Sequence, residues 1–219
     1  MNNEEKRYLS AASGFFTAFV AFTVLVKNVD VKPIGALFSK VGFASLNKWF
    51  LKTAGRSDFW YDVSQLLGYL ALAVCVCFVC IGFYQLISSK KGLKGVSRGI
   101  WATAFIYILV LVTYLFFEKV MVVNYRPIIG ENSLLEPSYP SSHTMLALCV
   151  YLAAADQVGK LLDNRAASTI LAWLCWLAAI ATVVSRLLSG VHWLTDIIGA
   201  MLVSASYICA YLAAAGGKR

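Results

Sequence analysis

Long runs of apolar residues, separated by short polar stretches, dominate the chain. A helix needs roughly 20 apolar residues to cross a hydrocarbon core about 30 Å thick. Five segments reach this length clearly and a sixth is interrupted, and we expect all six to span a membrane: residues 9–27, 65–87, 100–122, 143–160, 168–188 and 193–214. The pattern predicts an all-α fold, a polytopic bundle of six transmembrane helices.

The connection between the first two spans, residues 28–62, has a different pattern. Residues 33–58 carry apolar side chains at helical spacing with lysines between them: Ile34, Leu37, Phe38, Val41, Leu46, Trp49 and Phe50. This spacing is typical of an amphipathic helix at the membrane interface. It predicts a connector packed on the bundle or, less commonly, a lid over a lipid head group.

The composition agrees with a membrane protein. Hydrophobic residues make up 60% of the chain and charged residues 14%, which lies outside the balance of soluble domains. No Pro-rich, Ser-rich or highly charged linker divides the sequence, so we expect residues 1–219 to form one domain. The net charge of +8 gives no reason to expect a nucleic acid partner, and the sequence assigns no oligomeric state.

Lysine and arginine in short loops favour the cytoplasmic side of a membrane. Six spans place both termini on one side, where ten basic residues fall: Lys6, Arg7, Lys90, Lys91, Lys94, Arg98, Lys160, Arg165, Lys218 and Arg219. The 28–62 connection carries basic residues on the other side, but long connections weigh less. We therefore expect a multi-pass cell-membrane protein with cytoplasmic termini.

Three polar clusters interrupt the apolar pattern at the ends of predicted spans. One contains Lys119 and Arg126, the second Ser141, Ser142 and His143, and the third Arg186, His192 and Asp196. Counting spans places all three on the membrane face opposite the termini. Ionisable groups at membrane depth cost roughly 2.5–3.5 kcal/mol at mid-span, so they usually line a cavity and serve a function.

These residue types suit the binding of a phosphate ester, which carries about 1.5–2 negative charges and three acceptor oxygens. Lys119, Arg126 and Arg186 can neutralise that charge. The Ser141 hydroxyl and the backbone N–H groups of Ser142 and His143, at the start of a helix, add hydrogen-bond donors. We expect these donors also to stabilise the transition state of phosphoryl transfer.

The two histidines are the only ones in the chain, and their surroundings predict different roles. His192 and Asp196 are four residues apart and would share a face if residues 192–196 are helical. Asp196 could then fix the His192 tautomer and leave the other ring nitrogen free to attack phosphorus. His143 lacks such a partner and could protonate the leaving oxygen. The alternative is that Asp196 only satisfies a buried histidine.

Histidine and carboxylate could also hold a metal ion. Three cations around the two histidines would repel a divalent ion, so we expect catalysis without a metal and without a cofactor.

The clusters together resemble the type-2 phosphatidic acid phosphatase superfamily, whose three motifs read KxxxxxxRP, PSGH and SRxxxxxHxxxD. Lys119 to Pro127 and Ser185 to Asp196 match the first and third motifs, in order and without gaps. The second reads Pro-Ser-Ser-His over residues 140–143, with Ser142 in place of the usual glycine. Three ordered motifs, in the region 119–196, are more specific than any one of them.

The resemblance implies a lipid phosphatase that forms a phosphohistidine on His192 at the outer membrane face. It assigns Asp196 to the support of His192 and His143 to acid catalysis. The residues that it assigns to phosphate binding are Lys119, Arg126, Ser141, Ser142 and Arg186.

The motifs do not identify the lipid. A bacterial inner-membrane enzyme with an outward-facing site would suit undecaprenyl diphosphate, and phosphatidylglycerophosphate and phosphatidate are the alternatives. A phosphotransferase would share the phosphohistidine and differ only in its acceptor. A third class, an anion or lipid transporter, would also use intramembrane arginines but has no need of the His192–Asp196 pair.

Overall fold

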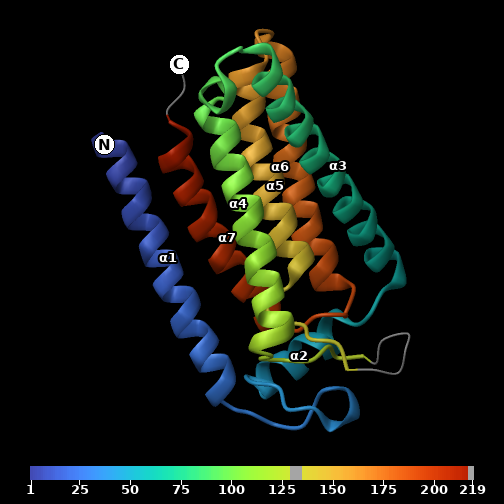
Figure 1. Ribbon diagram of the computed structural model, residues 1–219. Helices are drawn as coiled ribbons and strands as arrows, with labels where there is room; N and C mark the ends of the chain where they lie inside the picture. Colours follow the sequence, from blue (N-terminus) through green and yellow to red (C-terminus); the bar gives the residue numbers. More distant parts are fainter. Residues whose placement is uncertain (129–134, 217–219) are drawn as a thin grey trace.

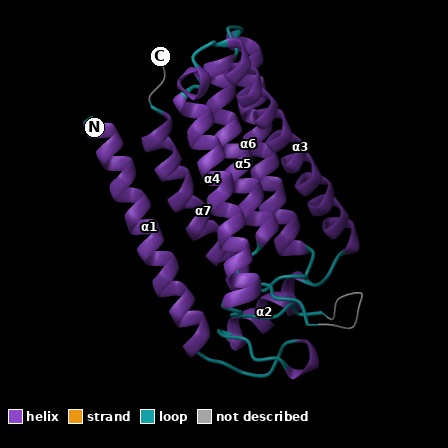
Figure 2. Cartoon of the chain, in the orientation of Figure 1, coloured by secondary structure: helices purple, strands orange, loops and turns teal. Residues whose placement is uncertain are grey.

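The computed structural model describes residues 1–128 and 135–216, and these residues form helices joined by short connections (Figures 1 and 2). Seven α-helices occur in this part of the chain: α1 (Asn3–Asn28), α2 (Ala44–Ala54), α3 (Asp58–Ser88), α4 (Arg98–Leu115), α5 (Ser142–Leu161), α6 (Arg165–Leu188) and α7 (Leu194–Ala215). Lys218 and Arg219, which the topology prediction counted, lie outside the described residues.

Six helices are long and apolar enough to cross a membrane, which confirms the predicted six-span, all-α bundle. They are α1, α3, α4 with its extension, α5, α6 and α7. One boundary differs clearly from the prediction: helix α3 begins at Asp58 rather than at residue 65. The predicted span 100–122 consists of α4 and a π-helical turn, η3 (Phe116–Val120). The earlier start of α3 adds residues to the end of the bundle where η3 also lies.

The spans divide into central and peripheral helices. In Figure 1, α5 and α7 run through the middle of the bundle, with α1 beside α7 and α3 at the opposite edge. The core between them is apolar and closely packed, with Ile106, Met145 and Val203 fully buried. Trp173 and Leu177 on α6 are exposed, as a bilayer-facing surface requires.

The two ends of the bundle carry different segments of the chain. The start of α1 and the end of α7 lie at one end, where Glu4 and Gly216 line a shared cavity (Figure 1). Helix α2 and the connection between α4 and α5 lie at the other end. The three polar clusters are at this second end.

The expectation of one helical face over residues 33–58 was wrong in extent. Only α2 and a short 3-10 turn, η1 (Ala36–Phe38), are helical there. Gly42 prevents a continuous helix, because it packs directly against the Val26 carbonyl and returns the chain to the end of α1. Of the two predicted roles, the packed connector fits better, since Asn47 on α2 is fully buried against the start of α7.

We predict that Gly42→Ala destabilises the protein, because a Cβ there would lie 1.6 Å from the Val26 carbonyl oxygen. The backbone must move, at a cost of about 1–3 kcal/mol typical of overpacking. The midpoint of thermal unfolding in detergent should fall. Gly14→Ala on α1 is the control, because its Cβ meets nothing within 4 Å. Equal midpoints for the two variants would contradict the close approach.

Candidate active site

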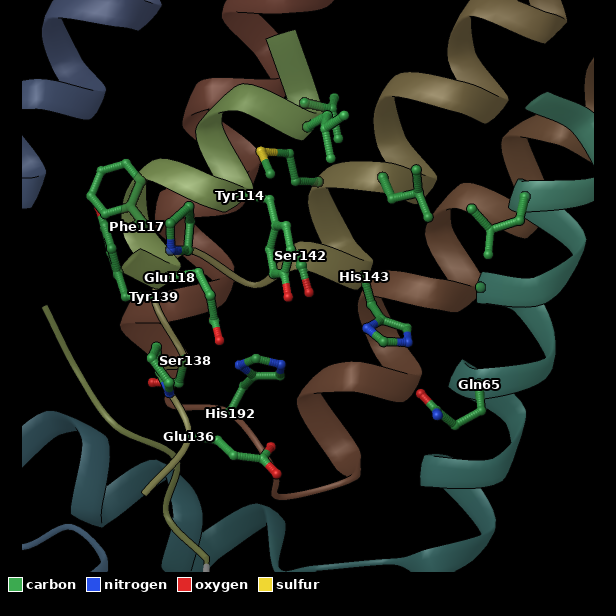
Figure 3. A pocket seen from close by; sticks show the side chains of 18 of the residues that line it. Gln65, Tyr114, Phe117, Glu118, Glu136, Ser138, Tyr139, Ser142, His143 and His192 are labelled. Carbon is green, nitrogen blue, oxygen red and sulfur yellow. The ribbon is translucent and has the colours of Figure 1, made fainter. Parts of the chain in front are cut away.

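A cavity of about 840 Å³ occupies the α2 end of the bundle. Figure 3 shows His143 and His192 near its end, with Gln65 and Glu136 close by. Its polar lining includes side chains from α3, η3, α5, the α4–α5 connection and the α6–α7 connection: Gln65, Glu118, Arg126, Glu136, Ser138, Ser142, His143 and His192. The structure therefore brings both histidines to one cavity, although they are far apart in sequence.

The start of α5 supplies the second cluster. Ser142 is the first helical residue and keeps an ordinary helical backbone, so a serine in place of the usual glycine causes no strain there. The first backbone N–H groups of a helix have no partner within it, and they favour an anion. The Ser141 N–H donates to the Asp196 carbonyl oxygen at 3.1 Å, which joins this helix start to α7.

His143 has room because Gly68 faces it from α3. A Cβ on Gly68 would lie 2.9 Å from His143 Cδ2 and 3.3 Å from Nε2. A glycine at this position thus allows the imidazole to pack directly on the α3 backbone.

Arg186 is 1% exposed, although it carries a full charge. One guanidinium nitrogen, Nη2, donates to Gln65 Oε1 at 3.3 Å, and the guanidinium carbon lies 5.7 Å from the centre of the Tyr61 ring. Within the described residues, its Nε and Nη1 have no hydrogen-bond partner and it forms no ion pair. A buried charge is costly unless it is paired, so this guanidinium suits an anion in the cavity.

Arg126 also reaches the cavity, but it is already paired. Its Nη1 lies 3.1 Å from Glu136 Oε2, while its buried Nε has no partner in the described part of the chain. A phosphate at this position would compete with the Glu136 carboxylate for the guanidinium.

Three predicted phosphate ligands do not line the cavity: Ser141 and Arg186 are buried beside its wall, and Lys119 lies apart from it. Lys119 lies in η3, its side chain is 72% exposed, and its nearest charged partner is Glu118, with Nζ 3.8 Å from Oε1. Glu118 lines the cavity and Lys119 does not. Contact between Lys119 and a phosphate therefore stays a prediction.

His192 and Asp196 are close, but they are not on one helical turn as predicted. Helix α7 begins at Leu194, and the chain reaches it through a turn at Gly190, whose φ is +70°. His192 Nδ1 lies 3.6 Å from Asp196 Oδ2, slightly longer than a hydrogen bond. The ring nitrogen opposite, Nε2, has no partner among the described residues.

Burial is the main influence on the pKa of His192, which lies outside the membrane-spanning helices. Burial and the charges of Arg186 and Arg126 lower the pKa, the nearby Asp196 carboxylate opposes them, and the net pKa is about 4. His192 is therefore neutral near pH 7, with a ring lone pair available for attack on phosphorus.

The sequence analysis missed five residues that shape this end of the bundle: Tyr61, Gln65 and Gly68 on α3, Asn47 on α2, and Asn124. A polar Gln65 at the start of an apolar span was a usable signal. Asn47 and Asn124 have no such pattern. Both lie between the spans, and only the folded structure shows that Asn124 contacts Asp196 and that Asn47 contacts Thr195.

Fold and cavity together define a polytopic helical membrane protein with a histidine-lined cavity, beside which the Arg186 guanidinium is buried. Comparison with known families identifies the class further. The PAP2 superfamily matches residues 10–218, and the chain belongs to this family of membrane lipid phosphatases.

A solved structure, described as the first transmembrane PAP2-type phosphatidylglycerolphosphate phosphatase, from Bacillus subtilis, has the same fold. It superposes with a TM-score of 0.59 at 20% identity, covering 93% of this chain and 94% of that one. A search of curated proteins returned no match.

We predict that Gly68→Ala lowers turnover with little effect on folding. The added Cβ must displace His143, and a shift of about 1 Å in a reacting group can cost on the order of 100-fold in rate. Phosphate release and thermal unfolding would be measured side by side. Gly159→Ala on α5, where a Cβ meets nothing within 4 Å, should retain full turnover. Unchanged turnover in Gly68→Ala would show that His143 does not need this position.

We also predict that His192 titrates near pH 4, below the value of 6.5 usual for histidine. His143→Ala leaves His192 as the single imidazole in the chain, so its ¹⁵N chemical shifts can be followed against pH in detergent. The ring should be neutral above pH 5 and become protonated only as the pH falls through about 4. A midpoint between 6 and 7 would contradict the effect of burial.

Proposed function

We propose that the protein hydrolyses the phosphate ester or diphosphate of a membrane lipid, through a covalent phosphohistidine on His192 and without a metal ion. The observation that carries this proposal is Arg186, a fully buried guanidinium whose Nε and Nη1 have no partner among the described residues and whose Nη2 donates to Gln65 on the cavity wall. A phosphate group would supply the missing charge.

The cavity also fits a lipid. Beyond the histidines it continues between α3 and α4 along apolar and aromatic side chains, including Leu72 and Leu111, which are also exposed on the outside of the bundle. A second, apolar cavity of about 210 Å³ follows between the same helices, and Tyr107 lines both. A head group would thus lie among charges while its hydrocarbon chain lies against an apolar surface.

In the proposed first step, the neutral His192 Nε2 attacks phosphorus and a P–N bond forms as the bond to the lipid oxygen breaks. His143, protonated, gives its proton to that oxygen. Arg186, Arg126, Ser141 and the N–H groups of Ser142 and His143 bind the phosphoryl oxygens as charge redistributes. Asp196 stabilises the charge that develops on His192, and Lys119 adds a cation from the edge of the cavity.

In the second step, a water molecule attacks phosphorus while His143 accepts its proton. The P–N bond breaks, its electron pair returns to His192, and inorganic phosphate leaves. If a lipid hydroxyl replaced water, the same steps would make a phosphotransferase, and turnover would depend on that acceptor.

Undecaprenyl diphosphate is the first candidate substrate, because a site opposite cytoplasmic termini would face outward from a bacterial inner membrane. The even number of spans and the basic residues at the terminal end support this orientation. Phosphatidylglycerophosphate, named for the structural relative, and phosphatidate are the alternatives.

The test is phosphate release by the purified protein in detergent with EDTA, using each of the three lipids. We expect phosphate release from at least one lipid. The rate of release should fall by more than about 1,000-fold in His192→Ala, because the nucleophile is removed. Incubation with ³²P-labelled substrate should leave a label on the parent protein that is stable to base and labile to acid. Arg186→Gln should raise KM and lower kcat, whereas Arg165→Gln, on the exposed far end of α6, should behave as the parent protein.

Three outcomes would oppose the proposal. Activity that EDTA abolishes and added metal restores would replace the metal-free mechanism. Release that survives in His192→Ala would remove the phosphohistidine, and no release from any lipid would favour the transporter.

A further inference from the structure

A cluster of fully buried polar side chains lies behind the cavity, away from the substrate. Asn47, Asn124, Thr195 and Asp196 each have 0% exposure. They come from three separate parts of the chain: α2, the segment after η3, and the first turn of α7. Such a cluster is costly to bury unless its members form hydrogen bonds with one another. The pattern of these bonds therefore indicates which side chains are held in place.

The bonds of the Asp196 carboxylate fix its rotation. Oδ1 accepts a hydrogen bond from Asn124 Nδ2 at 2.9 Å, and Oδ2 accepts one from the Trp193 backbone N–H at 3.0 Å. The oxygen that faces His192 Nδ1, at 3.6 Å, is Oδ2. With both oxygens held, the carboxylate keeps one edge toward the imidazole.

Asn124 is itself held in one orientation. Its Oδ1 accepts from the Gly42 backbone N–H at 3.4 Å, and its backbone carbonyl accepts from the Ser138 N–H at 2.9 Å. Because Oδ1 faces a donor and Nδ2 faces a carboxylate, reversing the amide would break both contacts. The close approach of Gly42 to α1 therefore supports the Asn124 side chain.

Asn47 occupies the same cluster and shares two partners with Asn124, namely Gly42 and Thr195, because Asn124 Nδ2 also donates to Thr195 Oγ1 at 3.4 Å. Its Nδ2 donates to Thr195 Oγ1 at 3.0 Å and to the Gly42 carbonyl at 2.8 Å, and its Oδ1 accepts from the Thr195 N–H at 3.2 Å. It binds α2 to the start of α7 without contact to Asp196. The two asparagines thus form a matched pair, equally buried, of which only Asn124 bonds to the carboxylate.

We infer that Asn124 is a positioning residue for catalysis, which orients Asp196 and through it the His192 nucleophile. Asn124 is fully buried and does not line the cavity, so we expect it to act through its bond to Asp196. Without its donor, Asp196 Oδ1 would be buried and unpaired, and the carboxylate would turn toward another partner. Partners of this kind, one step behind a reacting group, typically change activity by about 10–100-fold. The inference rests on the proposed histidine phosphatase.

The experiment is a double-mutant cycle on Asn124→Ala and Asp196→Ala, with kcat and KM measured for the lipid that the parent protein hydrolyses. Asn124→Ala should lower kcat about 10-fold or more and leave KM within about threefold. In the Asp196→Ala background, read at raised enzyme concentration, the same change should lower kcat by less than about twofold, because its partner is gone.

Asn47→Ala is the control for a purely structural effect. It should lower the thermal midpoint about as much as Asn124→Ala, yet its effect on kcat should be small and equal in both Asp196 backgrounds. Asn124→Asp, which keeps the side-chain shape but replaces the donor by an acceptor, is the second variant if Asn124→Ala does not fold. It should lose at least as much kcat, because two carboxylates would then face each other.

Parent-like kcat in either Asn124 variant would overturn the inference, and so would a loss that persists undiminished in the Asp196→Ala background. Failure of the proposed function looks different. In that case the parent protein itself releases no phosphate, or His192→Ala retains activity, whatever Asn124 contributes.

Discussion

The hydrogen bonds of Asp196 join the three polar segments of this protein into one site. Its side chain binds the segment that carries Arg126 through Asn124, and its backbone carbonyl accepts the Ser141 N–H at the start of α5. Because Asp196 also lies next to His192, one residue connects the start of α5, the segment that carries Arg126, and the proposed nucleophile. The site depends on these contacts more than on any regular packing of the spans.

The bilayer explains why the site is at the ends of helices. Irregular backbone is tolerated near a membrane only where it is buried in protein or borders a cavity. The connections at the α2 end meet this condition, because the buried side chains of Asn47 and Asn124 accept hydrogen bonds from backbone N–H groups of these connections and of the start of α7. The spans below remain apolar and can place a hydrocarbon chain against the same cavity.

The sequence predicted the spans well because apolar length alone specifies a membrane helix. It also identified ionisable residues that the structure gathers at the cavity, among them His143 and His192, since such residues are conspicuous in an apolar chain. Their roles in catalysis stay predictions. Prediction from the sequence failed where tertiary contacts decide the result. The amphipathic spacing of residues 33–58 suggested a long helix, but the contact of Gly42 with Val26 interrupts it. The spacing of His192 and Asp196 suggested one helical turn, but a tight turn at Gly190 brings them together instead. Asn124 gave no signal at all.

The Arg126–Glu136 ion pair has a consequence for how the enzyme releases its product. Glu136 belongs to the same molecule, so its effective concentration at Arg126 is that of a tethered group, commonly in the millimolar range. Free phosphate can displace Glu136 from Arg126 only at a concentration comparable with that effective concentration. A lipid head group, in contrast, is delivered at the high local density of a membrane surface. The carboxylate would thus displace the soluble phosphate that each turnover leaves behind and keep Arg126 available to the next membrane-borne phosphate.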